Sequence, residues 1–459
     1  MSTINYQLST IMSSRDFNRV TSDSIDRAST AAGSGNWSLV IDTLQNLSLD
    51  RLHDNDRVLD LALQVLIEGD FEQQWEIAKI IPKLGEIAIQ PLLDLVNDSD
   101  IDLENRWFGA RILGGFARPQ VVTALVELIH QDEDPELTAI ATGALTKIGT
   151  PAIAALTDLL ATPDRGMAVG ILAQIRHSQT IEPLIQVIDD PDPQLRTLIV
   201  EALGSFHDPR IGPLLLNKLT DVAASVRTAA VVALSLRGDL ATKLDLLQHL
   251  RPLLFDLNLA VCKATALGLA RLPDPAVVTV LTEVLASPHT TNDLRSAIIL
   301  ALGWIGTRSA IDRLIAVANT FPELAPEIVT SISKTEQQRV YASQMLVDYL
   351  QSNDTSEPHP AIVKQEIAAA LGNLGNLDTV TALIPLLGDP DDRVKLYTIA
   401  AMSKLSPTIP PEILHLASKD VPSSEGVAIL PELRIGIEMY LSHWHERAKS
   451  SLDAIETIT

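Results

Sequence analysis

The stretch that decides the fold reads Asp192-Pro-Gln-Leu-Arg196, followed by Glu201-Ala-Leu-Gly204. An acid, an apolar residue and a cation are followed, six to eight residues later, by small and apolar residues and often by a glycine. The same order recurs at Asp293-Leu-Arg295 with Leu300-Ala-Leu-Gly303, and at Asp391-Asp-Arg-Val-Lys395 with Ala400-Ala-Met402. Such self-similarity predicts a chain built from short repeated units.

The repeat has a period of about 32 residues. With the cation as the reference point, successive units place there the residues Gln74, Arg106, Thr138, Arg165, Arg196, Arg227, Ala260, Arg295, Lys364 and Lys395. The interval from Arg295 to Lys364 is about two periods, so one degenerate unit is expected near residues 322–334. Units of this length contact mainly their neighbours in the chain.

The sequence pattern of each repeat unit predicts two helices. The first helix is expected in stretches such as residues 181–188 and 380–387. Asp can cap the second helix and Pro can begin it, as in Asp134-Pro135 and Asp192-Pro193. The apolar face of the second helix recurs with helical spacing, at Val226, Ala229, Ala230, Ala233 and Leu234. Glycines are expected to end these helices in the left-handed conformation, at Gly114, Gly149, Gly204 and Gly238.

No helix pair of this size can bury its apolar face alone, so stacked units must share one core. Hydrophobic residues make up 46% of the 459 residues and aromatic residues 4%, which suits closely packed helices. We predict an all-α chain that forms a right-handed α-solenoid of about eleven two-helix repeats. Its expected parts are a flexible N-terminal arm or cap (1–35), the repeat solenoid (36–420) and a C-terminal capping helix (421–459).

The unit resembles the HEAT repeat, with its Asp-Pro, Val-Arg and Ala-Leu-Gly signature, over roughly residues 55–420. More narrowly, it is similar to the HEAT-like subclass of cyanobacterial phycobilin lyase subunits and their relatives. These relatives include lyases that attach tetrapyrroles to phycobiliproteins, and non-enzymatic scaffolds, one of which binds an A-type iron–sulfur carrier. The resemblance implies a scaffold fold and supplies no catalytic motif that can be placed on residues of this chain.

The family also contains a di-iron enzyme, deoxyhypusine hydroxylase, whose metal site needs several His-Glu pairs. This chain has one such pair, His445-Glu446, and its ten histidines form no cluster in the sequence, so we expect no metal site. The single cysteine, Cys262, allows neither an intramolecular disulfide nor a Cys-clustered metal site.

Charge and hydropathy exclude further classes of function. With 58 acidic and 35 basic residues, the net charge of −23 is opposite to that of a phosphate-binding surface, so no nucleic-acid partner is expected. The apolar stretches are too short for a membrane span, and the N-terminus lacks the apolar segment of a secretory signal. We therefore expect a cytoplasmic protein.

The recurring cations, Arg106, Arg196, Arg227, Arg295, Lys364 and Lys395, could form a binding stripe. We favour a structural ladder, in which they bond to acids in the turns within and between repeats. The turn acids expected to accept these bonds are Asp102, Asp134, Asp192, Asp256 and Asp391.

Two tryptophans supply a candidate partner-binding site. Positions one and five residues after the reference point should line the inner, concave face of the second helices, and they hold Trp75 with Lys79 and Trp107 with Arg111. The i, i+4 spacing puts each pair on one side of its helix, where the cation could lie over the indole. Exposed Trp and Arg dominate binding hot spots. The alternative is that both indoles pack into a neighbouring repeat, and the sequence leaves both open.

Cys262 has two interpretations. It falls on the face occupied by Leu198, Ala229 and Ile140 in other units, which favours a buried small hydrophobe. The alternative is a reactive thiol or a cluster ligand, for which the neighbouring Lys263 would lower the thiol pKa if both reach water.

The sequence thus favours a non-enzymatic scaffold without a cofactor that binds a protein on its concave face, the partner being a phycobiliprotein or an iron–sulfur carrier. The alternative is a bilin lyase or chaperone subunit, which would hold a bilin transiently. A bridged iron–sulfur cluster is the other cofactor that the resemblance implies.

Overall fold

The computed structural model describes residues 14–47, 54–131, 134–352 and 359–405. Within these ranges every regular element is a helix, and the chain divides into two compact units. The capping helix expected at 421–459 and the pair His445-Glu446 lie outside the described residues.

Unit 1 comprises residues 1–206. Its helices are α2 (Ser14–Ala32), α3 (Trp37–Asn46), α4 (Asn55–Glu68), α5 (Phe71–Ile77), η2 (Ile81–Ala88), α6 (Ile89–Asn97), α7 (Leu103–Leu113), α8 (Pro119–Gln131), α9 (Pro135–Ile148), α10 (Thr150–Leu159), α11 (Arg165–Gln174), η3 (Ser178–Thr180), α12 (Ile181–Gln186) and α13 (Pro193–Gly204).

Unit 2 comprises residues 207–459. Its described helices are α14 (Ile211–Lys218), α15 (Ala224–Ser235), η4 (Gly238–Leu240), α16 (Leu246–Leu250), η5 (Arg251–Phe255), α17 (Leu259–Leu269), α18 (Ala276–Leu285), α19 (Asn292–Ile305), α20 (Arg308–Thr320), η6 (Pro322–Leu324), α21 (Ala325–Ile332), α22 (Arg339–Gln351), α23 (Ala361–Leu374), η7 (Leu377–Thr379), α24 (Val380–Leu383), η8 (Ile384–Gly388) and α25 (Asp392–Leu405).

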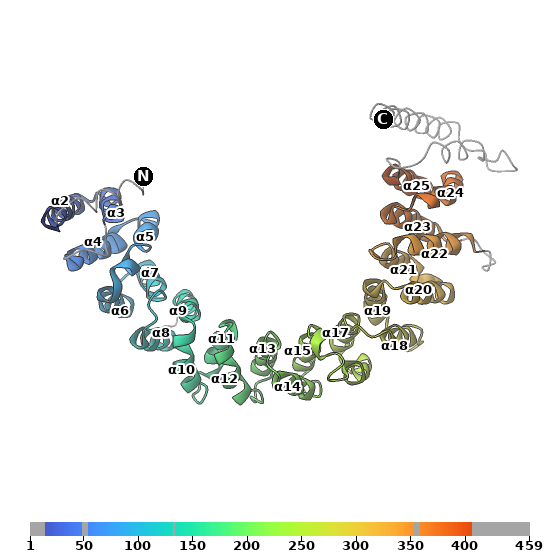
Figure 1. Ribbon diagram of the computed structural model, residues 1–459, viewed down its shortest axis with the longest axis horizontal. Coiled ribbons are helices and arrows are strands. Elements are labelled where there is room, and N and C mark those ends of the chain that lie inside the picture. Colours follow the sequence, from blue (N-terminus) through green and yellow to red (C-terminus); the bar gives the residue numbers. More distant parts are fainter. Residues whose placement is uncertain (1–13, 48–53, 132–133, 353–358, 406–459) are drawn as a thin grey trace, which may run out of the picture. The chain divides into compact units, whose positions relative to one another are not determined.

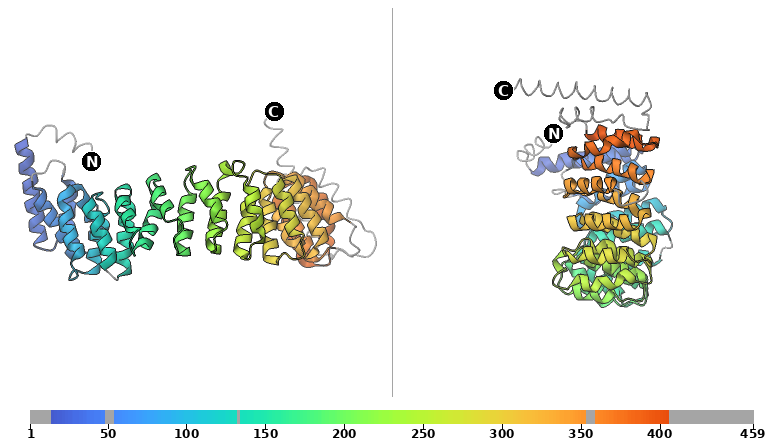
Figure 2. Two further views of the ribbon diagram at one scale, coloured as in Figure 1. Left: turned by 90° about the horizontal axis from the view of Figure 1, so that it is seen from below. Right: turned by 90° about the vertical axis from the view of Figure 1, so that its right-hand side faces the viewer.

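Each unit has two layers of helices (Figure 1). In unit 1 the second helices α7, α9, α11 and α13 contact one another in chain order, and each also contacts the first helix of its own repeat. In unit 2 the same holds for the row from α15 to α25, and Figure 2 shows the helices of each unit lying side by side. The predicted all-helical α-solenoid is confirmed.

The predicted caps explain where second helices begin. The Asp134 carboxylate accepts the backbone N–H groups of Glu136 and Leu137 at the start of α9, and Pro135 occupies the first turn. Asp192 accepts the N–H of Gln194 at the start of α13 in the same way. These contacts satisfy backbone donors that the first turn leaves without a helical partner.

The prediction of left-handed glycines is wrong at all four positions. Gly149 has a positive φ of 71°, but its ψ of −127° lies outside the left-handed helical region, and Gly114, Gly204 and Gly238 do not have a positive φ. Gly114 instead allows close packing, because a Cβ there would lie 2.9 Å from Cα and Cβ of Ala144 in the next second helix. The left-handed helix ends are at Gly306 and Gly375.

Helix α2 lies within the stretch expected to form a flexible arm or cap. Its Ile25 and Ala28 are fully buried, and it contacts α3 and α4. Residues 1–13 of that stretch lie outside the described residues. No helix in the described part of the chain is long and apolar enough to cross a membrane.

Candidate protein-binding surface

Helices α5 and α7 bring the two predicted tryptophans together in unit 1. Asp70 and Gln73 form a reciprocal capping box at the start of α5, which fixes where that helix begins. The buried Gln74 amide donates to Asn105 Oδ1 on α7 at 2.7 Å and to the Leu66 carbonyl at 3.0 Å. A buried polar group without a hydrogen bond costs free energy. The bond between Gln74 and Asn105 therefore holds α5 against α7 directly beside Trp75.

Four aromatic rings form a continuous cluster across the two helices. Phe71 stacks on Trp75 with ring centroids 6.0 Å apart, and both rings contact Phe108, at 5.6 and 6.2 Å. Trp107 meets Phe108 edge to face at 5.1 Å. These separations are those of favourable aromatic pairs.

Arg111 lies over both indoles. Its guanidinium carbon is 4.2 Å from the ring centroid of Trp75 and 5.6 Å from that of Trp107. The predicted contact between a cation and the indole one turn before it is therefore present in the Trp107–Arg111 pair. It is absent from the other pair, where Lys79 bonds to Glu76 and Arg111 of the next repeat covers Trp75 instead. We call Phe71, Trp75, Trp107, Phe108 and Arg111 the aromatic–arginine surface.

The aromatic–arginine surface is partly open to solvent. Phe108 is fully buried and anchors the cluster, both indoles are half-buried, and Phe71 is 58% exposed. Arg111 is exposed, and no carboxylate of the described residues lies within ion-pair distance of it. Each indole is thus partly packed on the core and partly open to solvent. This outcome lies between the two alternatives that the sequence left open, exposed indoles and indoles packed into a neighbouring repeat.

The equivalent positions on the next two second helices carry almost no side chains. Burial and chain register align Trp107 and Arg111 of α7 with Ala139 and Gly143 of α9, and with Gly166 and Gly170 of α11. A Cβ added to Gly143 or Gly170 would meet no other atom within 4 Å. The aromatic–arginine surface therefore adjoins positions on α9 and α11 that carry only alanine or glycine.

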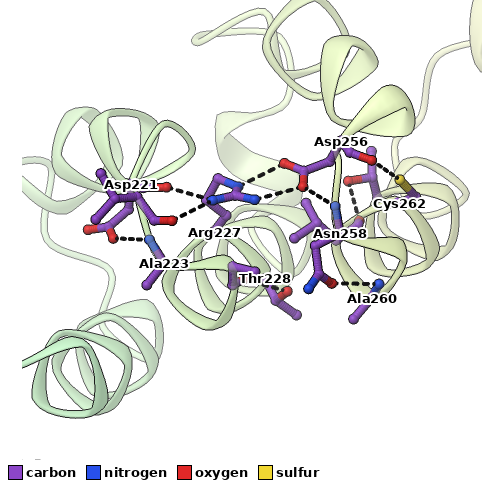
Figure 3. A network of polar contacts seen from close by, with 12 residues as sticks. Asp221, Ala223, Arg227, Thr228, Asp256, Asn258, Ala260 and Cys262 are labelled. Atoms are coloured by element: carbon purple, nitrogen blue, oxygen red, sulfur yellow. Dashed lines mark hydrogen bonds and ion pairs between the residues drawn. The ribbon is translucent and has the colours of Figure 1, made fainter.

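The predicted ladder of cations is present, with some of its acids reassigned. In unit 2 Arg227 forms two bonds to Asp256 of the next repeat, Nε to Oδ2 at 2.8 Å and Nη2 to Oδ1 at 2.7 Å (Figure 3). Its Nη1 donates to the carbonyl oxygens of Asp221 and Val222. The bond from Arg227 lowers the pKa of the Asp256 carboxyl, and that from Asp256 raises the pKa of Arg227.

Elsewhere the ladder uses acids two residues earlier than predicted. Arg165 pairs with Asp190 at 2.8 Å and Lys364 with Asp389 at 2.7 Å, whereas Asp192 caps α13 and Asp391 accepts the N–H of Arg393. The remaining cations bond locally: Arg106 to the Val96 carbonyl, Arg196 to the Asp190 and Pro191 carbonyls, Arg295 to the Ser287 carbonyl, and Lys395 to Asp392.

Cys262 occupies the position in its repeat that the ladder cation Arg227 holds one repeat earlier. Its Sγ lies 3.1 Å from the Asp256 carbonyl oxygen, just as Arg227 Nη1 bonds to the Asp221 carbonyl one repeat earlier (Figure 3). The reference point of this unit is therefore Cys262, and not the exposed Ala260 that the constant period selected. The residue is 4% exposed, and burial raises the pKa of its thiol. These observations favour the buried interpretation over the reactive one, because the thiolate is the reactive form.

No metal site is found in the described residues, where no three His, Cys, Asp or Glu side chains are grouped to hold an ion. The pKa of Asp239 falls to about 2, because Arg237 donates two hydrogen bonds to its carboxylate. In this pair Arg237 is buried and the Asp239 side chain is 44% exposed.

Comparison with protein families agrees with the repeat. A family model described as HEAT repeats matches residues 89–168, 162–235, 181–254 and 244–325, which together span more than half of the chain. The chain belongs to the HEAT-repeat family. In this HEAT-repeat protein the cation ladder and the close-packed Gly114 belong to a repeat unit that recurs along the chain. The aromatic–arginine surface, by contrast, is confined to two helices.

Similar solved structures include human deoxyhypusine hydroxylase in complex with glycerol, at 20% identity over 58% of this chain and 99% of that one, with a TM-score of 0.25. Importin beta matches at 13% identity over 89% and 68% of the two chains, with a TM-score of 0.41. The karyopherin Kap121p bound to the SUMO protease Ulp1p matches at 14% identity over 96% and 52%, with a TM-score of 0.46. No curated protein sequence matches this HEAT-repeat protein.

Proposed function

We propose that this protein is a non-enzymatic scaffold that binds another protein through the aromatic–arginine surface of unit 1. The observation that carries the proposal is Arg111, which is held over two indoles and has no carboxylate partner among the described residues. Trp and Arg are the residues most enriched among those that dominate binding energy. Since stacking already restricts the Arg111 side chain before binding, that side chain loses less conformational entropy when a partner binds.

The chemistry of the surface selects the partner. Arg111 offers a planar, bidentate donor to a carboxylate, while Phe71 and the exposed parts of the indoles offer apolar contact. The partner surface should therefore present an acidic residue next to an apolar one. The sequence resemblance implies a phycobiliprotein or an iron–sulfur carrier as the partner, and with either partner we propose a cytoplasmic location.

Site-specific photo-crosslinking tests the proposal in the native host. A photo-reactive benzoylphenylalanine replaces Lys79, which is exposed beside Trp75, and in a control protein it replaces the exposed Gln90 on the first-layer helix α6. The proposal predicts one protein crosslinked through position 79 and not through position 90. That protein should be lost when Arg111→Ala is added to the position-79 variant.

The two positions separate specific binding from general adhesion. Equal crosslinking from positions 79 and 90 would contradict the proposal, and so would a crosslink at 79 that Arg111→Ala leaves intact. Circular dichroism of the Arg111→Ala protein serves as the folding control, and because the side chain is exposed, its helical signal should equal that of the wild type.

A second candidate function is that of a bilin lyase or chaperone subunit. The observation that favours it is the same guanidinium, since a tetrapyrrole propionate could pair with Arg111 while the ring system lies on the indoles. Expression together with a bilin-producing pathway should then yield a coloured protein that transfers its chromophore to a phycobiliprotein cysteine. A colourless product that still binds its protein partner would exclude this function. A bridged iron–sulfur cluster at Cys262 is not part of either proposal, because that thiol is buried.

A further inference from the structure

Unit 2 contains an open groove of about 460 Å³ on the second helices α17, α19 and α21. Its lining includes the cations Lys263 and Lys334, the carboxylates Asp293 and Glu327, and the apolar Leu267 and Leu300. The volume lies within the range of small-ligand sites, roughly 300–1,000 Å³, so the groove can accept at least one large side chain. It belongs to unit 2 alone and shares no residue with the aromatic–arginine surface.

The polar groups on one side of the groove already have partners within the protein. Lys263 Nζ pairs with Asp293 at 3.1 Å. The Ser296 hydroxyl donates to Glu327 at 3.0 Å, and the Thr330 hydroxyl donates to Glu366 at 2.9 Å. An incoming charged group gains little here, because it would have to displace these bonds.

Apolar side chains line the groove on α17 and α19 and continue onto a neighbouring helix. Leu267 and Leu300 occupy equivalent positions on α17 and α19, and Val232, which is 45% exposed, occupies that position on α15. Trp304 follows Leu300 by one helical turn and is 52% exposed. Four apolar side chains on three adjacent helices thus border solvent without a cover from the described residues.

Two cations flank Trp304. In the repeat register, Arg271 just after α17 and Lys334 just after α21 are equivalent to Trp304, and both are exposed. No carboxylate of the described residues lies within ion-pair distance of either. Basic residues suit the negative end of a helix dipole, which explains their charge but not the exposed indole between them. Apolar contact and unpaired positive charge therefore meet at this end of the groove.

From this arrangement we infer that the groove is a second docking site, for an acidic and apolar segment of a partner protein. A leucine-like side chain of the segment enters between Leu267 and Leu300. The carboxylates of neighbouring residues in the segment pair with Arg271 and Lys334. Trp304 covers the apolar residue between them. The site is independent of the proposed function at Arg111, so the two can fail separately.

Fluorescence anisotropy tests the inference with a labelled synthetic peptide in which leucine and glutamate alternate. The comparison peptide has lysine in place of each glutamate. The full-length protein should bind the acidic peptide and not the basic one. Lys334→Glu should weaken binding roughly tenfold, because attraction becomes repulsion. The matched control Arg313→Glu changes the same charge on the first-layer helix α20 and should leave binding unchanged.

Three outcomes would overturn the inference. The first is equal binding of the two peptides, and the second is equal affinity in Lys334→Glu and Arg313→Glu. The third is a groove filled by a second copy of the chain, in which case Trp304→Ala would convert a dimer to a monomer in sedimentation without any effect of the peptide. Binding of the acidic peptide should persist in Arg111→Ala, which separates this site from the aromatic–arginine surface.

Discussion

Replacing Arg227 by methionine should destabilise unit 2 far more than the same change at an exposed arginine. Arg227 and its partner Asp256 are 15% and 11% exposed in their side chains, and the guanidinium forms two bonds to the carboxylate and two to carbonyl oxygens. Loss of one partner of a buried pair costs about 3–5 kcal/mol. Asp256 keeps the Asn258 N–H and has slight access to water, so we expect about 3 kcal/mol.

The control is Arg251→Met in the same unit. Arg251 pairs with Glu283 at 3.3 Å, but the two side chains are 55% and 59% exposed. An exposed pair of this kind contributes at most about 1 kcal/mol. Urea unfolding followed by circular dichroism measures both variants, and hydrogen exchange in α15 and α17 shows whether the loss is local.

The dependence on pH provides a further check. Because Arg227 lowers the pKa of Asp256 in the folded protein, the contribution of the pair is complete above the pKa of an unfolded aspartate, about 3.9. It is lost as the pH falls through the lower folded pKa. The difference in unfolding free energy between wild type and Arg227→Met should be constant from pH 7 to about 5 and should shrink below about 4. A difference no larger than that of Arg251→Met at neutral pH would refute the reasoning.

Two other predictions concern packing and reactivity. Gly114→Ala should destabilise unit 1 by about 1–3 kcal/mol, because its Cβ would lie 2.9 Å from Ala144. Gly143→Ala should stabilise it by up to about 1 kcal/mol, because that Cβ meets no atom within 4 Å and alanine favours a helix; thermal melting that ranks the two in the other order would contradict the packing argument. Cys262 should react with a disulfide reagent at pH 7 far more slowly in the native protein than in urea, since burial both shields the thiol and raises its pKa. An equal rate in the two conditions would show that the native thiol is accessible.

The sequence was sufficient to predict the helices and their buried faces. Val226, Ala230 and Leu234 are all fully buried in α15, as their helical spacing required. The predicted caps at Asp134 and Asp192 are also present, because capping is a local interaction between residues close in the chain. Local patterns of this kind need no knowledge of neighbouring repeats.

Contacts between repeats were harder to predict. The glycine at Gly114 lies near a helix end, so it suggested a left-handed cap, while its actual reason is the close approach of Ala144 thirty residues later. In the unit of α17 the reference cation is replaced by Cys262, and the distance from Arg227 grows to about 35 residues. A constant period therefore selected Ala260, and only the bond from Cys262 to the Asp256 carbonyl reveals the true register.

The candidate surface was predicted in part. Recurrence in register identified Trp75 and Trp107, and helical spacing identified Arg111. Phe71 was missed, although it precedes Trp75 by one helical turn and that spacing was visible in the sequence. The position of Arg111 over Trp75 depends on how α5 and α7 pack, which the buried bond between Gln74 and Asn105 sets and which no local pattern records.

The most direct test of the account is the affinity of the protein captured through position 79, measured by titration calorimetry. The purified partner is titrated with the wild type, with Arg111→Ala and with the control Arg57→Ala, which changes an arginine of the first-layer helix α4 that pairs with Asp26. We predict that Arg111→Ala weakens binding at least about tenfold and that Arg57→Ala leaves it unchanged. Equal affinities for the wild type and Arg111→Ala would contradict the assignment of the aromatic–arginine surface as the binding site.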